Sequence, residues 1–199
     1  RMMEYHLDKD YTMRVAEHLG NPKKEKIYNI YSIEEISEMS FSCPNCALLM
    51  KAPNSTQQRP TLGIPDTKFV LLNDRAKMIT KAPIRVIDLS LLELHNSRTF
   101  WDIGACTGSV SIEARRQYPH LNIQAFEVRE ECKDIIRANA RLHSAPGIDL
   151  HIGNFLNLPI AENAIVDAVF IGGHGGKLKE IICKVASHLD KLKIGRAHV

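Results

Sequence analysis

A glycine-containing stretch of the sequence combines residue types that could hold a small molecule. It reads WDIGACTG from residue 101 to residue 108 and leads directly into a helix-forming run. Gly104 and Gly108 permit a tight turn and the close approach of a ligand, and a helix N-terminus offers free amide donors. Asp102, at the end of the predicted strand, is placed to accept a hydrogen bond from an amine or an ordered water. An ordinary strand-to-helix turn is the alternative interpretation.

The loop does not match the two commonest phosphate-binding motifs. It contains neither G-x-G-x-x-G, which binds a dinucleotide, nor G-x-x-x-x-G-K-[ST], which binds a triphosphate with magnesium. D-x-G-x-x-x-G therefore indicates a different nucleotide-type ligand. The next predicted strand ends in Glu127, about where an acidic residue reaches a ribose diol. Alternatively, Glu127 belongs with Glu130 and Glu131 to an acidic first turn of a helix.

The elements that must position these residues alternate between helices and short apolar strands. The patterns predict strands over 98–104, 122–128, 148–153 and 164–172, and helices over 109–118, 130–143 and 176–192. A further helix is predicted over 81–94, capped by Thr80, with an apolar face of Ile84, Ile87, Leu91 and Leu94. Helices between parallel strands predict a doubly wound, Rossmann-like α/β sheet, which binds ligands outside the carboxyl ends of its strands.

The first 60 residues are predicted to form a separate small α/β piece. We expect a helix over 12–20, a strand over 26–32, a short helix over 32–39 and a buried strand over 46–50. The run 51–60 is polar and has no periodic apolar face, so we interpret it as a linker. The domains are therefore predicted as 1–60 and 61–199. Because the sequence opens at Arg1 and stops soon after a predicted helix, we expect a fragment with about four strands, truncated at the C-terminus.

Composition and charge exclude several classes of protein. The 199 residues are 44% hydrophobic and 25% charged, as in soluble globular proteins, and a net charge of +3 does not favour nucleic acid as a partner. No apolar run reaches the roughly 20 residues of a membrane helix, and no secretory signal is recognisable. The five cysteines are scattered and odd in number, which predicts free thiols and a cytoplasmic location. Cys43 and Cys46 lack the second ligand pair of a zinc site, so we expect no metal.

The motifs carry a resemblance to a known family. D-x-G-x-x-x-G followed by an acidic strand end resembles the class I S-adenosylmethionine-dependent methyltransferases. More narrowly, GIPDTKF, ITKAPIR, WDIGACTGSVSIEA and AVFIGGHGG, in this order, resemble the decarboxylating C15-methyltransferase domain of cobalamin biosynthesis. That domain acts on precorrin-6 or its cobalt form, and the resemblance covers residues 63 to about 195. Residues 11–65 are similar to the tail of a tetrapyrrole C5-methyltransferase that is often fused ahead of it.

The resemblance implies a binding site for S-adenosylmethionine. Asp102 would lie beneath the amino group of the cofactor, Glu127 would take its ribose hydroxyls, and Asn154 would border its adenine. Cys106 stands where the family commonly has glycine. The implied cofactor-binding residues are Thr80, Asp102, Gly104, Ala105, Gly108, Glu127, Gly153, Asn154, Gly172 and Gly173. His174 and Lys81 are the implied catalytic candidates, and with Arg75 and Lys177 they are the nearest cations for an anionic substrate.

The implied activity is transfer of the sulfonium methyl group to the C15 meso carbon of precorrin-6 or cobalt-precorrin-6, with decarboxylation of the ring-C acetate. Alignment of an activated methyl group with an electron-rich carbon supplies much of the catalysis, so no metal is needed. The implied partner is an anionic tetrapyrrole, without nucleic acid or membrane, and a homo-oligomer is possible. Two alternatives stay open: a methyltransferase of RNA or protein, although the I-G-G-H-G-G loop argues against amino-group methylation, and an inactive nucleotide-binding or partner-binding fragment.

Overall fold

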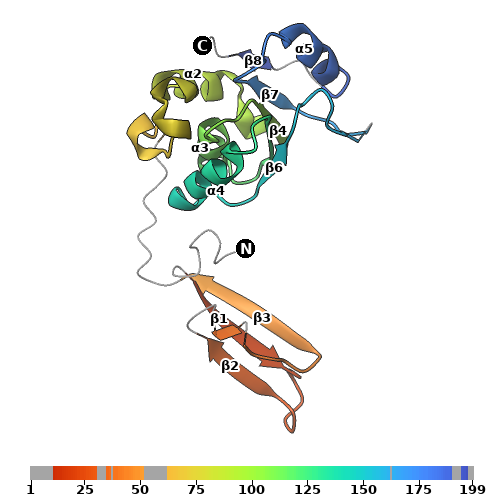
Figure 1. The fold of residues 1–199 in the computed structure, drawn as a ribbon. Helices are drawn as coiled ribbons and strands as arrows, with labels where there is room; N and C mark the ends of the chain where they lie inside the picture. Colours follow the sequence, from red (N-terminus) through yellow and green to blue (C-terminus); the bar gives the residue numbers. More distant parts are fainter. Residues whose placement is uncertain are drawn as a thin grey trace. The chain divides into compact units, whose positions relative to one another are not determined.

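The computed structural model describes residues 11–30, 35–36, 38–51, 62–161, 163–189 and 194–196. The chain divides into two compact units, Arg1–Arg59 and Pro60–Val199, which are described separately below (Figure 1). Across the described ranges, no helix is both long enough and apolar enough to cross a membrane.

The first unit is a three-stranded antiparallel sheet in the order β2-β1-β3. The prediction of a helix over 12–20 is wrong, because β1 (Tyr11–Glu17) is the central strand of this sheet. β2 (Lys26–Ile30) and β3 (Asn45–Lys51) hydrogen-bond to its two edges, and this pairing outweighs the local helical preference of the run. Burial alternates at the end of β1, where Val15 and Glu17 are buried and Ala16 is only partly so.

The other predictions for this unit have mixed outcomes. The strand over 26–32 is confirmed for Lys26–Ile30. The strand over 46–50 is confirmed in type, but it is not buried, because Leu48 is 57% exposed. Residues 32–34 and 37 of the predicted helix over 32–39 lie outside the described residues. Of the rest, Glu35 and Ile36 are helical, whereas Glu38 and Met39 are not.

The second unit contains a five-stranded parallel sheet in the order β6-β5-β4-β7-β8. Its strands are β4 (Thr99–Ile103), β5 (Asn122–Glu127), β6 (Ile148–Ile152), β7 (Ala168–Ile171) and β8 (Ile194–Arg196). This confirms the predicted doubly wound α/β fold, although β8 is a strand beyond the four that were expected. From β4 the chain runs outward through β5 and β6 and then returns to β7, so the strand order reverses between β4 and β7, where such sheets bind ligands.

The helices of the second unit cover the two faces of the sheet. They are α2 (Ala82–Leu91), α3 (Ser109–Gln117), α4 (Cys132–Leu142) and α5 (Leu178–Ala186). Successive side chains of each strand point to opposite faces, so the core has two main clusters. The first packs α2 and α3 on the sheet through Leu89, Phe100, Val110, Ile123 and Phe170. The second packs α5 on the other face through Trp101, Phe126, Val169, Ile181 and Val185.

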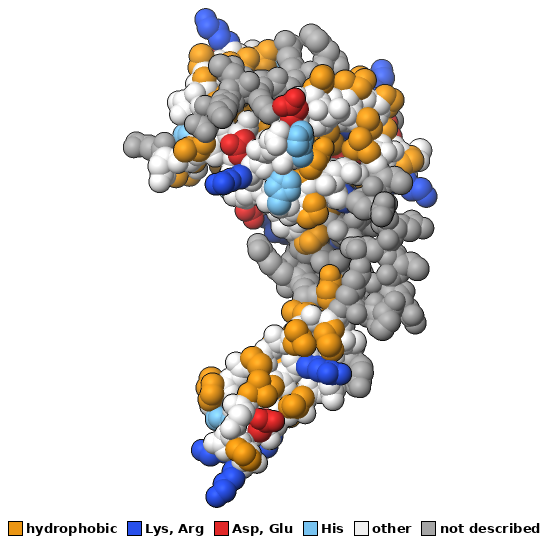
Figure 2. Space-filling view, turned by 180° about the vertical axis from the view of Figure 1, so that it is seen from behind, with side chains coloured by type: hydrophobic (Ala, Val, Ile, Leu, Met, Phe, Trp, Pro, Cys, Tyr) orange, Lys and Arg blue, Asp and Glu red, His pale blue; other side chains and the backbone are white. Residues whose placement is uncertain are grey.

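Helix α2 packs in a different orientation from the one its apolar spacing indicates. Ile84, Ile87 and Leu91 are 40%, 54% and 73% exposed, whereas Arg85 and Leu89 are fully buried. Leu94, the fourth residue of the predicted face, is buried as expected, but it lies beyond the end of the helix. Figure 2 shows such hydrophobic side chains at the surface of the molecule. The helix is turned in this way because its inner face meets charged groups as well as the apolar core. Arg85, a residue that a hydrophobicity pattern assigns to solvent, is therefore part of the interior.

Thr80 is not the cap of α2, contrary to the prediction. Lys81 occupies the N-cap position and makes no side-chain capping bond. Instead, the amide of Ala82 donates to Oδ1 of Asp66 at 3.0 Å. A carboxylate from an earlier segment thus satisfies the first free amide of the helix, which sequence spacing around residue 80 does not show.

Candidate functional site

A cavity of about 510 Å³ lies at the carboxyl ends of the central strands of the second unit. The loops that follow β4, β5, β6 and β7 form most of its wall, and the segment before α2 contributes Lys77, Met78, Ile79 and Thr80. Its volume lies within the range of about 300–1,000 Å³ that small-molecule sites occupy. The cavity is located where the sheet topology predicts a ligand, since the carboxyl ends of parallel strands meet at one edge.

The glycine loops after β4 and β7 pack directly on each other. Gly104 has a φ of +80°, and a Cβ atom there would lie 2.4 Å from the backbone nitrogen of Gly173. The amide of Gly172 donates to the carbonyl of Ile103 at 2.8 Å, which fixes the second loop against the end of β4. Gly104, Ala105, Gly172 and Gly173, which the family resemblance assigns to cofactor binding, all line the cavity. Contact between two backbones, in addition to any ligand, therefore requires glycine at position 104.

Gly108 has a packing role outside the cavity lining. It is the N-cap residue of α3 with a φ of +73°, and a Cβ atom there would lie 3.0 Å from Cγ2 of Ile136 on α4. The close side chain of the next helix thus accounts for glycine at position 108, and the approach of a ligand to Gly108 stays a prediction.

The carboxylate of Glu127 is buried at the end of β5 and faces the cavity. Its Oε2 accepts a hydrogen bond from the amide of Cys106 at 2.8 Å, and its Oε1 accepts one from the amide of Arg129 at 2.9 Å. The Arg129 guanidinium also lies 3.3 Å from Oε1. Glu127 therefore ties the loop after β4 to the loop after β5, and Arg129, which sequence reasoning missed, is a cation on the cavity wall.

Cys106 lines the cavity in a left-handed backbone conformation, with a φ of +47°. This conformation favours glycine, which agrees with the glycine that the family commonly has there. Burial raises the pKa of the Cys106 thiol, so the thiol is neutral near pH 7. We therefore assign it a role in shaping the loop rather than one as a nucleophile.

Asp102 is buried and does not form part of the cavity lining. Its Oδ2 accepts hydrogen bonds from the amide of Ser111 at 3.1 Å and from the hydroxyl of Ser111 at 2.6 Å. Its Oδ1 has no hydrogen-bond partner among the described residues. Burial raises the pKa of Asp102 to about 6. Asp102 therefore fixes the first turn of α3, and its contact with a ligand amine stays a prediction.

Gly153 and Asn154, which the family resemblance assigns to cofactor binding, line the cavity after β6. The amide of Gly153 donates to the carbonyl of Glu127 at 2.8 Å, and Oδ1 of Asn154 accepts from the amide of Leu156 at 3.1 Å. Lys184 on α5 holds this loop, because its Nζ donates to the carbonyls of Phe155, Leu156 and Leu158 at 2.8, 3.1 and 2.8 Å. No motif marked Lys184, since its partners are backbone atoms of a distant segment.

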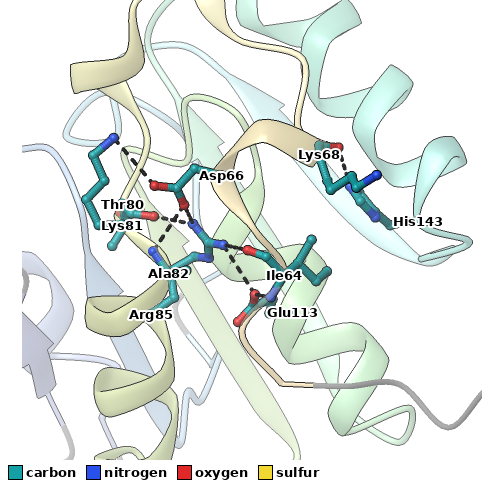
Figure 3. A network of polar contacts seen from close by, with 9 residues as sticks. All are labelled: Ile64, Asp66, Lys68, Thr80, Lys81, Ala82, Arg85, Glu113 and His143. Carbon is teal, nitrogen blue, oxygen red and sulfur yellow. Dashed lines mark hydrogen bonds and ion pairs between the residues drawn. The ribbon is translucent and has the colours of Figure 1, made fainter.

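The two catalytic candidates have different environments. His174 lines the cavity, and its Nδ1 accepts a hydrogen bond from the amide of Gly176 at 3.2 Å. Lys81 is outside the lining and points toward Asp66, whose Oδ2 is 3.4 Å from its ammonium (Figure 3). Of the other predicted cations, Lys177 lines the cavity and Arg75 does not, while Lys77 lines it without having been predicted. Thr80 and His174 both line the cavity, whereas Lys81 does not.

Comparison with known proteins identifies the family. A family model described as a precorrin methyltransferase domain matches residues 72–196. The chain belongs to this family. The match spans the predicted domain from the segment before α2 to β8, and it confirms the resemblance that the motifs carry.

Relatives of the family agree with this placement. The cobalt-precorrin-6B C15-methyltransferase (decarboxylating) of Salmonella typhimurium is 38% identical over 111 residues, which are 56% of this chain and 56% of that protein. The chain therefore spans about half the length of the curated relatives it matches. The crystal structure of precorrin-6y C5,15-methyltransferase from Geobacter metallireducens is 36% identical with a TM-score of 0.61, and the match covers 69% of this chain and 71% of that one.

Proposed function

We propose that the second unit binds S-adenosylmethionine and transfers its methyl group to C15 of precorrin-6 or cobalt-precorrin-6, with decarboxylation of the ring-C acetate. The observation that carries the proposal is the buried Glu127 carboxylate on a cavity that is lined in part by two glycine loops packed on each other. The Salmonella typhimurium relative is named for C15 methylation with decarboxylation in cobalt-precorrin-6B. Membership of the precorrin methyltransferase family supports the same substrate class.

The residues present fit the proposed cofactor. Glu127 would hold the ribose hydroxyls, the backbone of Gly104 and Ala105 would approach the methionine part, and Gly153 with Asn154 would border the adenine. When bound, S-adenosylmethionine supplies an activated methyl group on a sulfonium. The chain's own contribution would be to fix the direction from which the acceptor carbon approaches, because that carbon must reach the methyl carbon from the side opposite the sulfonium sulfur, whose bond to the methyl group breaks.

The substrate side of the cavity is proposed to lie between the segment before α2 and the loop after β7. Lys77 comes from the first of these walls, and His174 and Lys177 come from the second. A tetrapyrrole with several carboxylates would find cations on both sides, which favours an anionic substrate. His174 is the proposed catalytic side chain at this end. Lys81, whose partner is Asp66, is proposed to stabilise the wall rather than to act in catalysis.

We also infer that residues 1–60 are the C-terminal part of a tetrapyrrole methylase-like domain and that 61–199 are an incomplete C15-methyltransferase domain. Two observations support this inference. The chain divides into compact units at Arg59 and Pro60. A Sinorhizobium relative, 33% identical over 133 residues, is named for methylation at both C5 and C15, and the match covers 31% of its length.

Calorimetric titration of the full chain with S-adenosylhomocysteine tests the cofactor site. We expect saturable binding that Glu127→Gln weakens by about 1.5–3 kcal/mol, or roughly 10- to 150-fold, because hydrogen bonds to a charged group are lost. Glu130→Gln is the matched control, since Glu130 is an exposed glutamate three residues away. The affinity of this variant for S-adenosylhomocysteine should equal that of the wild type. NAD serves as the control ligand. A folded chain that gives no heat with S-adenosylhomocysteine contradicts the proposal.

The acceptor is tested separately by supplying S-adenosylmethionine with precorrin-6 or cobalt-precorrin-6 and analysing the products by mass spectrometry. The proposal requires a product that has gained one methyl group and lost one carboxylate. Bulk RNA and protein are the competing acceptors, and methylation of either instead of the tetrapyrrole would show that the substrate assignment is wrong.

A further inference from the structure

One wall of the cavity belongs to a segment with little regular structure, which we call the strap (residues 62–81). The strap contains three short 3₁₀ turns, Asp66–Lys68, Leu72–Asp74 and Ala76–Met78, and none of its described residues pairs with a strand. Its last residues, Lys77 to Thr80, line the cavity. Side chains of neighbouring helices must therefore hold its backbone, because the strap satisfies few backbone groups by itself.

A single buried guanidinium joins the two ends of the strap. Arg85, fully buried on α2, donates from one terminal nitrogen to Oδ1 of Asp66 at 2.7 Å and to the carbonyl of Thr80. Its other terminal nitrogen donates to the carbonyl of Ile64 and lies 3.3 Å from Oε1 of Glu113 on α3. Figure 3 shows these contacts converging on Arg85 from both ends of the segment.

Two further contacts complete this cluster. Oε1 of Glu113 accepts the amide of Ile64 at 2.5 Å, so both backbone groups of Ile64 are bonded within it. Asp66 accepts the first amide of α2, from Ala82, at 3.0 Å. The two terminal nitrogens of Arg85 thus contact two carboxylates and two backbone carbonyls. A planar guanidinium can serve all of them at once, whereas the single ammonium of lysine cannot.

The other polar anchors of the strap hold its middle and not the cavity wall. Asn139 on α4 bonds both backbone groups of Val70, at 2.7 and 3.0 Å, and His143 bonds the carbonyl of Lys68 at 2.9 Å. Toward the cavity, Leu72 and Ile79 are buried as apolar contacts. The hydrogen bond from Arg85 to the Thr80 carbonyl ties the cavity wall itself to a helix.

We propose that Arg85 is a positioning residue for the cavity. Arg85 does not line the cavity, but it fixes the position of residues 77–80 through its hydrogen bonds to the Thr80 carbonyl and to Asp66. For ligand binding this rests on the proposed cofactor site. The consequence is that affinity for S-adenosylhomocysteine depends on a side chain that never touches it. The contact groups of a binding site must be held within about 0.5 Å of their productive positions, so a displaced wall should weaken binding.

The test compares Arg85→Lys with Arg115→Lys in the full chain. Arg115 on α3 is a matched control, because its guanidinium also donates to two backbone carbonyls, those of Pro119 and Gly147, and it is outside the cavity lining. We expect Arg85→Lys to weaken S-adenosylhomocysteine by roughly tenfold or more in calorimetry, and Arg115→Lys to leave affinity unchanged. Hydrogen exchange should accelerate in peptides from the strap and stay unchanged in peptides from α4.

Asp66→Ala is the second variant, in case Arg85→Lys does not fold. Asp66 is partly exposed, and its removal frees the Ala82 amide and one donor of Arg85. Equal affinity for the wild type and for a folded Arg85→Lys or Asp66→Ala variant, with unchanged exchange in the strap, overturns the proposal. If the wild type itself binds no S-adenosylhomocysteine, the proposed function fails, and exchange in the strap alone decides the role of Arg85: acceleration supports it and no change refutes it.

Discussion

Alanine at position 104 should destabilise the second unit more than alanine at any open glycine of the same backbone conformation. Gly104 has a φ of +80°, and its Cβ would lie 2.4, 2.7 and 2.8 Å from backbone atoms of Gly173. The left-handed conformation costs a residue with a Cβ about 1–2 kcal/mol. Because the neighbouring atoms are backbone and cannot rotate away, forcing the two loops apart adds about 1–3 kcal/mol.

The expected loss for Gly104→Ala is therefore about 2–5 kcal/mol in the free energy of unfolding. Gly176→Ala is the matched control. Gly176 has a φ of +81°, and no atom lies within 4 Å of its ideal Cβ, so it should show the conformational cost of about 1–2 kcal/mol alone. The difference between the two variants isolates the contact between the loops after β4 and β7.

Urea unfolding followed by tryptophan fluorescence measures these losses for the second unit. Trp101 is the single tryptophan of the chain and lies buried in β4, three residues before Gly104. Its emission reports on the sheet that carries the cavity. If Gly104→Ala and Gly176→Ala lose the same free energy, the loops do not meet as closely as described, and the reasoning is refuted.

Two further predictions concern Asp102 and the orientation of α2. Burial raises the pKa of Asp102 from 3.8 to about 6, so the folded state binds this proton more tightly than the unfolded state. The stability that Asp102 contributes through this proton is fully present below pH 3.8 and is lost as the pH rises through about 6. Between pH 4 and 7, the free energy of unfolding of the wild type should therefore fall by about 2–3 kcal/mol more than that of Asp102→Asn, as measured by urea unfolding. On α2, Ile87→Lys should change the free energy of unfolding by less than about 0.5 kcal/mol, whereas Leu89→Ala should lower it by about 2–5 kcal/mol. If thermal denaturation shows a larger loss for Ile87→Lys than for Leu89→Ala, Ile87 faces the core and the described orientation of α2 is wrong.

Local patterns predicted the elements around the cavity with good agreement. The strand before Gly104, the helix after it and the strand that ends in Glu127 are all present. They could be predicted because the pattern of apolar residues within each short run indicates which element it forms. The position of Glu127 on the cavity wall follows from the same order of elements. The family resemblance added His174 and the glycines after β7, which line the cavity, but also Lys81, which does not.

The failures lie where contacts between distant segments decide the outcome. The run after Tyr11 has a helical spacing, yet it becomes β1 because strands on both sides pair with it. Apolar spacing on α2 indicated Ile84 and Ile87 as its inner face, but Asp66 and Glu113 place a charged side chain there instead. Neither partner is a neighbour in sequence, so no local pattern contains the information.

The sequence by itself determined the alternation of strands and helices, the parallel sheet and the acid that ends β5, since these depend on periodicities within single runs. Only the tertiary structure decided that Gly104 is required by the backbone of Gly173 and that Asp102 holds the first turn of α3 through Ser111. The same holds for Arg85 as the link between both ends of the strap. Each of these roles depends on atoms that folding brings together from remote parts of the chain. A buried charge needs hydrogen-bond partners, and these come from segments that no local sequence pattern identifies.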